Sequence, residues 1–134
     1  MSKLIFLATV ALIPGPALAD NFWQECQIET ATICDQVGCR NVQPTIKLYL
    51  GDYTDAKGRP KGYYFRCRRD SSCDEIRAPW IGENENYRAF VAPERGLISR
   101  VAANGRVTDV ATLNDEVLIS RGTCWSSKPY RPGK

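Results

Sequence analysis

Six cysteines constrain the fold of this 134-residue chain more than any other feature of its sequence. An even number of cysteines in a small exported domain indicates a set of disulfide bonds, not reactive thiols or metal ligands. None of the six has the Cys-x-x-Cys spacing of a redox or zinc site. The cysteines are Cys26, Cys34, Cys39, Cys67, Cys73 and Cys124.

Turn-forming residues between the cysteines favour one of the 15 possible pairings. Residues 35–38 contain the Asp and Gly typical of a tight turn, which favours a bond between Cys34 and Cys39. Residues 68–72 favour Cys67 with Cys73 for the same reason. The remaining pair, Cys26 with Cys124, would join the two ends of the domain. Closing a loop of about 100 residues stabilises a fold by about 4–5 kcal/mol in the chain-entropy model.

The first 19 residues predict a cleavable export signal. Lys3 precedes an apolar stretch over residues 4–13, and Ala17 and Ala19 give the small-x-small pattern of a signal-peptidase site. The apolar stretch is too short to cross a bilayer, which needs about 20 residues. Asp20 follows the expected cut where a lipoprotein has cysteine. We therefore expect a periplasmic or secreted protein with no membrane insertion.

The rest of the chain suits a single domain. We expect one β domain over residues 20–125 and a flexible basic tail over residues 126–134. One of the 18 basic residues and none of the 15 acidic residues precede position 20, which leaves a net charge of about +2. That charge is too small to predict nucleic-acid binding.

Apolar and polar residues alternate along the domain with the period of half-buried strands. We expect Cys26, Ile28 and Cys34 on one face of the first strand, and Phe65 on the face of a later strand opposite Arg66. Eight short strands predict an all-β fold, a single antiparallel meander closed like a barrel or, alternatively, a two-sheet sandwich. The expected strands cover residues 24–33, 45–51, 62–68, 74–80, 86–92, 96–103, 106–112 and 116–124.

Asn104 and Gly105 predict a tight hairpin between two of these strands. Asn-Gly between alternating segments is typical of a two-residue type I′ turn. A two-residue loop would place Arg100 directly across from Asp109, as a favourable pair of opposite charges.

Several reaction chemistries lack the residues that they need. The chain contains no histidine, which removes the commonest general base and most zinc and copper ligands. No glycine motif for phosphate or dinucleotide binding is present. Most acidic residues flank turns, where carboxylates face solvent. We therefore expect no enzyme activity, no cofactor and no metal site.

Basic residues gather in the middle of the chain. Tyr64, Arg66 and Arg68 share the expected outer face of one strand, and Arg69 follows in the next turn. Arginine suits bidentate contacts with phosphate or carboxylate groups. We expect these four residues to contact an anionic partner; the alternative is an ordinary solvated strand face. The aromatic residues either pack the core or line a ligand-holding barrel.

These observations favour a non-catalytic exported protein that binds a macromolecular partner, either a protein or an anionic component of the cell envelope. The alternative hypothesis is a proteinaceous inhibitor of a hydrolase such as a lysozyme. The sequence leaves the ligand and the oligomeric state open.

Overall fold

The structure, a computed structural model, describes residues 23–78 and 80–128. These residues form one antiparallel sheet and a single turn of 3-10 helix, η1 (Pro93–Arg95). None of the helical structure in the described ranges is long and apolar enough to cross a membrane. The strands are β1 (Trp23–Cys34), β2 (Cys39–Val42), β3 (Ile46–Thr54), β4 (Pro60–Arg68), β5 (Cys73–Ala78), β6 (Trp80–Glu83), β7 (Tyr87–Ala92), β8 (Leu97–Ala102), β9 (Arg106–Leu113) and β10 (Glu116–Ser126).

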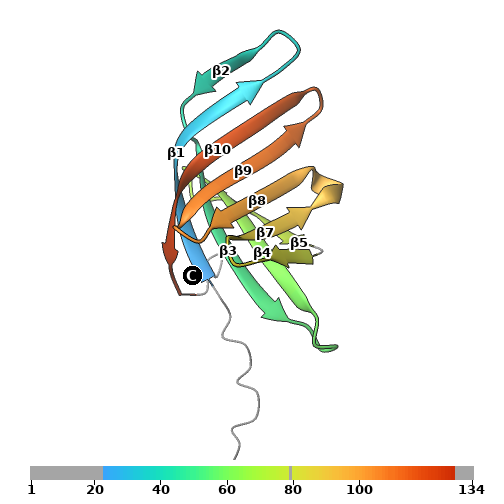
Figure 1. The fold of residues 1–134 in the computed structure, drawn as a ribbon. Helices are drawn as coiled ribbons and strands as arrows, with labels where there is room; N and C mark the ends of the chain where they lie inside the picture. The colour runs from blue at the N-terminus through green and yellow to red at the C-terminus, as the bar shows by residue number, and fades with distance from the viewer. Residues whose placement is uncertain (1–22, 79, 129–134) are drawn as a thin grey trace, which may run out of the picture.

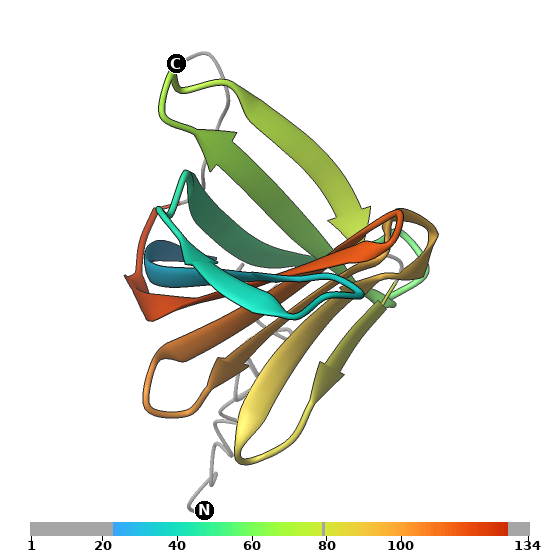
Figure 2. The ribbon, with the colours of Figure 1, turned by 90° about the horizontal axis from the view of Figure 1, so that it is seen from above.

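The sheet is a curled half-barrel, which confirms the predicted all-β, barrel-like meander. Its strand order is β5-β4-β3-β1-β10-β9-β8-β7-β6, and β2 pairs with the far part of β1. The hydrogen-bonded path ends at β5 and β6, the two strands that flank Pro79. The sheet curls so that β4 contacts β6 and β5 contacts β7 (Figures 1 and 2). The first and last strands are neighbours, as a barrel-like meander requires.

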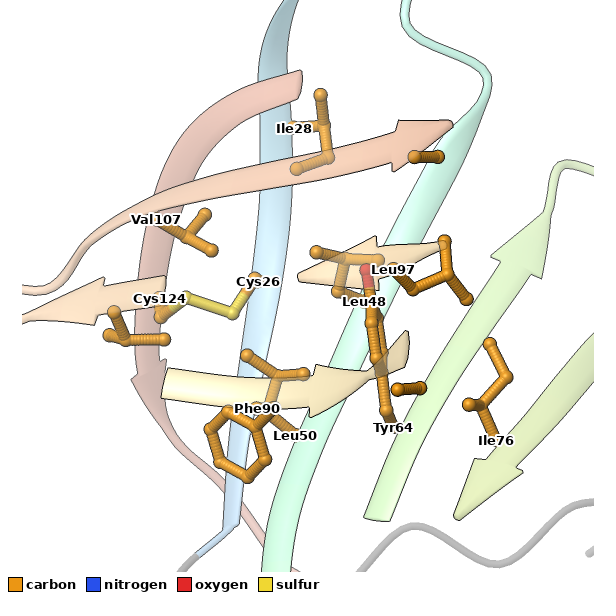
Figure 3. Packing of buried hydrophobic residues seen from close by; sticks show 13 residues of the cluster. Cys26, Ile28, Leu48, Leu50, Tyr64, Ile76, Phe90, Leu97, Val107 and Cys124 are labelled. Atoms are coloured by element: carbon orange, nitrogen blue, oxygen red, sulfur yellow. A yellow bond between two sulfur atoms is a disulfide. The ribbon is translucent and has the colours of Figure 1, made fainter. Parts of the chain in front are cut away.

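All three predicted disulfide bonds are present. Cys26 bonds to Cys124, Cys34 to Cys39 and Cys67 to Cys73, each with its two Cα atoms 4.0 Å apart. The two short-range bonds close the β1–β2 and β4–β5 hairpins. The long-range bond ties β1 to β10 inside the core (Figure 3).

The core occupies the concave face of the sheet and draws side chains from both of its halves. Leu48 and Leu50 of β3 are fully buried, as the alternation of that strand predicts. They meet Phe90 of β7 and Val107 of β9 across the interior (Figure 3). Because the core joins strands from the two ends of the sheet, hydrophobic burial favours the curled shape over a flat one.

Two ion pairs also cross the interior. Arg66 of β4 pairs with Asp109 of β9, and a guanidinium nitrogen of Arg88 on β7 lies 3.0 Å from a carboxylate oxygen of Asp52 on β3. Each pair joins the β3–β4 part of the sheet to the β7–β9 part. Side chains therefore hold together two parts of the sheet that are far apart in strand order.

A β-bulge in β1 overturns the expectation that one face of this strand carries Cys26, Ile28 and Cys34. The register with β10 shifts between Ile28 and Thr30. Cys26 and Ile28 point into the core, whereas Cys34 and its disulfide lie on the outer side of the sheet. A bulge adds one residue to one strand, so every side chain after it changes face.

The β8–β9 hairpin forms, but the predicted register is wrong by one residue. Arg100 pairs with Thr108, and Asp109 pairs with Ser99. Gly105 has a φ of 84°, and its N–H donates to the carbonyl of Ala102. The loop therefore contains three residues, 103–105, and this length directs Asp109 into the core.

Other boundaries differ in detail from the prediction. The expected strand over 74–80 is divided into β5 and β6, and β2 was not predicted. The gap between the expected strands 45–51 and 62–68 is shorter than predicted, because β3 extends to Thr54 and β4 begins at Pro60. Strand β10 reaches Ser126, and the Ser127 N–H bonds to the Trp23 carbonyl, so order extends into the expected tail. The predicted signal, residues 1–19, and the tail residues 129–134 lie outside the described residues.

Candidate functional site

Two of the four predicted partner-binding residues lie inside the protein. Tyr64 is fully buried in the core, so the expectation that Tyr64 and Arg66 face outward is wrong. Arg66 donates a hydrogen bond of 2.9 Å to the Tyr64 hydroxyl and forms its ion pair with Asp109. The outer face of β4 instead carries Tyr63 and Phe65. Both faces of β4 are covered, so alternation alone did not show which of them points inward.

The interior ion pair is costly to bury. Asp109 is fully buried between Ser99 and Ser120, its cross-strand neighbours on β8 and β10. Burial raises the pKa of Asp109 to about 8 and lowers the pKa of Arg66 to about 10, because removal from water penalises both charged forms. This pair belongs to the architecture and is not exposed to a macromolecular partner.

The other two predicted residues border a groove on the outer face of the sheet, which has a volume of about 820 Å³. Its floor follows a row of cross-strand partners: Gln27, Lys47, Cys67 and Cys73 on β1, β3, β4 and β5. We call it the basic groove. Its remaining lining residues are Ile28, Pro44, Thr45, Ile46, Tyr49, Arg68, Arg69, Ser71 and Trp125.

Among the residues that the structure describes, three cations and no carboxylate line the basic groove. Lys47 pairs with Glu25 beside the groove, and the hydrogen bond that Lys47 donates to Glu25 holds the pKa of Lys47 above its ordinary value. Arg68 lies 2.8 Å from Asp74. Arg69 has no ion pair with the described residues. The groove therefore presents an excess of positive charge, centred on Arg69.

The position of Arg69 is fixed by a tight turn and a disulfide bond. The Cys67–Cys73 bond closes the β4–β5 hairpin, and within its turn the Ser72 hydroxyl and N–H both donate to the Asp70 carboxylate. The guanidinium of Arg69 donates a 3.2 Å hydrogen bond to the Pro44 carbonyl. Arg69 thus connects two loops at the groove and keeps further N–H groups for a ligand.

Aromatic side chains border the cations. Tyr49 lies under the Lys47 ammonium group, 5.5 Å from its ring centre, and Trp125 is 44 % exposed at the β10 side. Beyond Tyr49 the same face continues into stacked rings of Trp23 and Phe65, 6.0 Å apart. A Cβ at Gly51 would lie 2.5 Å from the Trp23 indole, so this indole packs directly on the backbone of β3.

Sequence reasoning thus found Arg68 and Arg69 but missed Lys47, Tyr49 and Trp125. Alternation along β3 does place Lys47 opposite the buried Leu48. The predicted pairing of Cys26 with Cys124 also brings Trp125 to the strand next to β1. No sequence signal indicated that these residues lie near Arg69, because the groove crosses five strands, some of which are distant from one another in the sequence. Lys57 and Arg59, in the loop between β3 and β4, lie at the end of β4 opposite to Arg69 and do not line the groove.

The described residues contain no group of three or more acidic or cysteine side chains that could hold a metal ion. The arrangement on the outer face is that of a binding surface: fixed cations, flat rings, and hydroxyl and amide groups from Thr45, Ser71 and Gln27. No protein-family model matches the chain, and it matches no curated protein and no solved structure.

Proposed function

We propose that this protein is a non-catalytic binding protein of the periplasm or the extracellular space, and that its basic groove holds an anionic macromolecule. The observation that carries the proposal is the lining of the groove, in which the described residues supply three cations and no carboxylate. A site of one charge sign attracts ligands of the other and disfavours ligands of the same sign.

The groove is also rigid around Arg69, the residue that we expect to contact the ligand. Disulfide closure and the Asp70 turn fix Arg69, so little side-chain and loop freedom remains to be lost on binding. The exposed ring of Trp125 adds contact area at a low entropic cost. Three disulfide bonds support an oxidising location, because such bonds persist mainly outside the cytoplasm.

Charge reversal in the groove tests this proposal. We expect Arg69→Glu to weaken binding of the oxidised protein to a carboxylated polysaccharide by about tenfold or more, since it removes an unpaired charge and adds an opposing one. Poly-glutamate serves as a second probe that separates a polysaccharide partner from an acidic polypeptide. Calorimetry at low salt and at 0.5 M salt measures the affinity of the protein for each of the two probes.

The matched control is Arg77→Glu, which makes the same charge change on β5 outside the groove, at a side chain that is 74 % exposed. The affinity of this variant for the two probes should stay within about twofold of that of the unmodified protein. Equal losses in the two variants would show that only net charge matters. Failure of both probes to bind at low salt would remove the proposal.

One observation favours the alternative function, inhibition of a hydrolase. The β1–β2 hairpin, the uppermost in Figure 1, is closed by the Cys34–Cys39 bond and carries Val37 at its tip, 96 % exposed. The Asp35 carboxylate accepts hydrogen bonds from the N–H groups of Val37 (2.8 Å) and Gly38 (3.1 Å). A fixed loop that presents an apolar side chain is suited to enter the cleft of an enzyme.

Inhibition assays separate the two functions. If the hairpin tip is the inhibitory element, the protein inhibits a lysozyme or a peptidase, and Val37→Asp abolishes that inhibition while Arg69→Glu preserves it. If the basic groove is the functional site, none of the tested hydrolases is inhibited, and Val37→Asp binds the carboxylated polysaccharide as the unmodified protein does.

A further inference from the structure

A second cavity lies at one mouth of the half-barrel and shares the lining residues Thr45 and Ile46 with the basic groove. It has a volume of about 200 Å³ and is lined mostly by aliphatic side chains. Its polar lining residues differ in depth: Gln43 and Thr45 are exposed, whereas Ser120 is 1 % exposed. We call it the mouth cavity. The aliphatic lining residues are Ala31, Ile33, Val42, Ile46 and Leu118.

The Ser120 hydroxyl has no hydrogen-bond partner within the described part of the chain. It belongs to a row of inward side chains on β10, β9 and β8, in which Asp109 Oδ1 and the Ser99 hydroxyl also have no such partner. Buried polar groups in proteins are almost always hydrogen-bonded. Ser120 is the residue of this row that lines the mouth cavity, so its unpartnered hydroxyl indicates a ligand with a polar group.

We propose that the mouth cavity binds a small single-ring molecule that carries one hydroxyl group, a ligand of the phenol class. Size supports a single ring, because an apolar cavity of about 150 Å³ is sufficient for benzene. The aliphatic lining suits the ring and disfavours a charged ligand. The Ser120 hydroxyl can donate to or accept from the hydroxyl group of the ligand.

The experiment compares phenol with toluene, which has a similar shape but no hydroxyl group. We expect phenol to bind the oxidised protein with a Kd of about 1 mM, the affinity of a modest ligand of this size. Amide resonances of Ala31, Leu118 and Ser120 should shift on titration. Toluene should bind about five- to tenfold more weakly, because it cannot bond to Ser120.

Two variants make the result specific. Ser120→Ala keeps the cavity but removes the hydroxyl, so it should bind phenol and toluene about equally. Leu118→Trp should fill the cavity and abolish binding, whereas Ile119→Trp, on the outer face of the same strand, should bind phenol normally. Melting temperatures confirm that each variant is folded.

Three outcomes would overturn the proposal. The first is the absence of resonance shifts at the cavity with 10 mM phenol. The second is an undiminished preference of Ser120→Ala for phenol over toluene. The third is phenol-induced shifts confined to Tyr49 and Trp125, which would place the ligand in the basic groove. None of these outcomes bears on the proposed function, since the tests of the groove use Arg69.

Discussion

At the residue scale, one carboxylate best shows how tertiary context decides a role. Asp109 was expected directly across from Arg100, but the three-residue hairpin loop pairs it with Ser99 and places it in the core. There it pairs with Arg66, and burial raises the pKa of its carboxyl to about 8. A buried ion pair contributes little net stability, although removal of one partner is expensive.

The raised pKa of Asp109 predicts a pH dependence of stability. The folded state holds the Asp109 proton up to a pKa of about 8, whereas the carboxyl has an ordinary value of 3.8 in the unfolded chain. Between these two values the folded state binds more protons, so raising the pH lowers the free energy of unfolding. Urea unfolding at pH 5 and pH 8 should show this decline, and Asp109→Asn should show a flatter profile.

Glu94→Gln, at an exposed carboxylate of η1, serves as the control for this measurement, and its profile should follow that of the unmodified protein. Profiles of equal slope for Asp109→Asn and the unmodified protein would show that Asp109 does not titrate in this range.

Removal of Arg66 should also have a pH-dependent cost. At pH 9 the carboxyl of Asp109 is ionised, so Arg66→Met leaves an unpaired buried charge and should cost about 3–5 kcal/mol. At pH 5 the carboxyl holds a proton and the cost should be smaller. Combining Arg66→Met with Asp109→Leu should recover most of the loss at pH 9. Arg68→Met, at an exposed ion pair, should cost about 1 kcal/mol or less; a comparable loss there would contradict the assignment.

At the element scale, the β1 bulge decides which side chains of β1 reach the core. Opposite the bulge, β10 approaches β1 so closely that only Gly122 fits: a Cβ there would overlap the backbone carbonyl of Gln27. The extra residue of the bulge lets Ile28 and Ala31 both face the interior, although they are three residues apart in one strand.

We therefore expect Gly122→Ala to destabilise the protein by about 1–3 kcal/mol or more, because the atom that it strikes is backbone and cannot rotate away. Thermal and urea unfolding measure the loss. The neighbouring exposed substitution Arg121→Ala should change stability by about 0.5 kcal/mol or less. A Gly122→Ala variant as stable as the Arg121→Ala variant would show that β1 and β10 can move apart at the bulge.

At the scale of the whole molecule, side chains close the half-barrel and a disulfide bond secures its central strand pair. The hydrogen-bonded path of the sheet ends at β5 and β6, and the core and two ion pairs hold its halves together. The Cys26–Cys124 bond fixes the central β1–β10 pair, to which both halves attach. Its two cysteines are 98 positions apart in the sequence, far more than those of the other two bonds.

Loop length sets the expected order of disulfide contributions. In the chain-entropy model the Cys26–Cys124 bond stabilises by about 4–5 kcal/mol and the Cys34–Cys39 bond by about 2 kcal/mol. Replacing Cys26 and Cys124 by alanine should therefore lower the free energy of unfolding by about twice as much as replacing Cys34 and Cys39 by serine. Guanidinium unfolding measures both, and an equal or reversed order would contradict the entropic account.

The sequence by itself determined the all-β class, the three disulfide pairs and the position of the β8–β9 hairpin. The class, the hairpin and the two short-range disulfide pairs depend on local signals: alternation, and turn residues such as those between Cys34 and Cys39. The Cys26–Cys124 pair is the one that then remains. Of the site, it indicated Arg68 and Arg69. Tertiary structure decided which face of β4 turns inward, where Asp109 points and which residues line the groove. Both faces of β4 are covered, so its alternation could not show which one points inward. The direction of Asp109 follows from a loop longer by one residue, because a shift of one residue reverses every face, and the groove follows from pairing between distant strands.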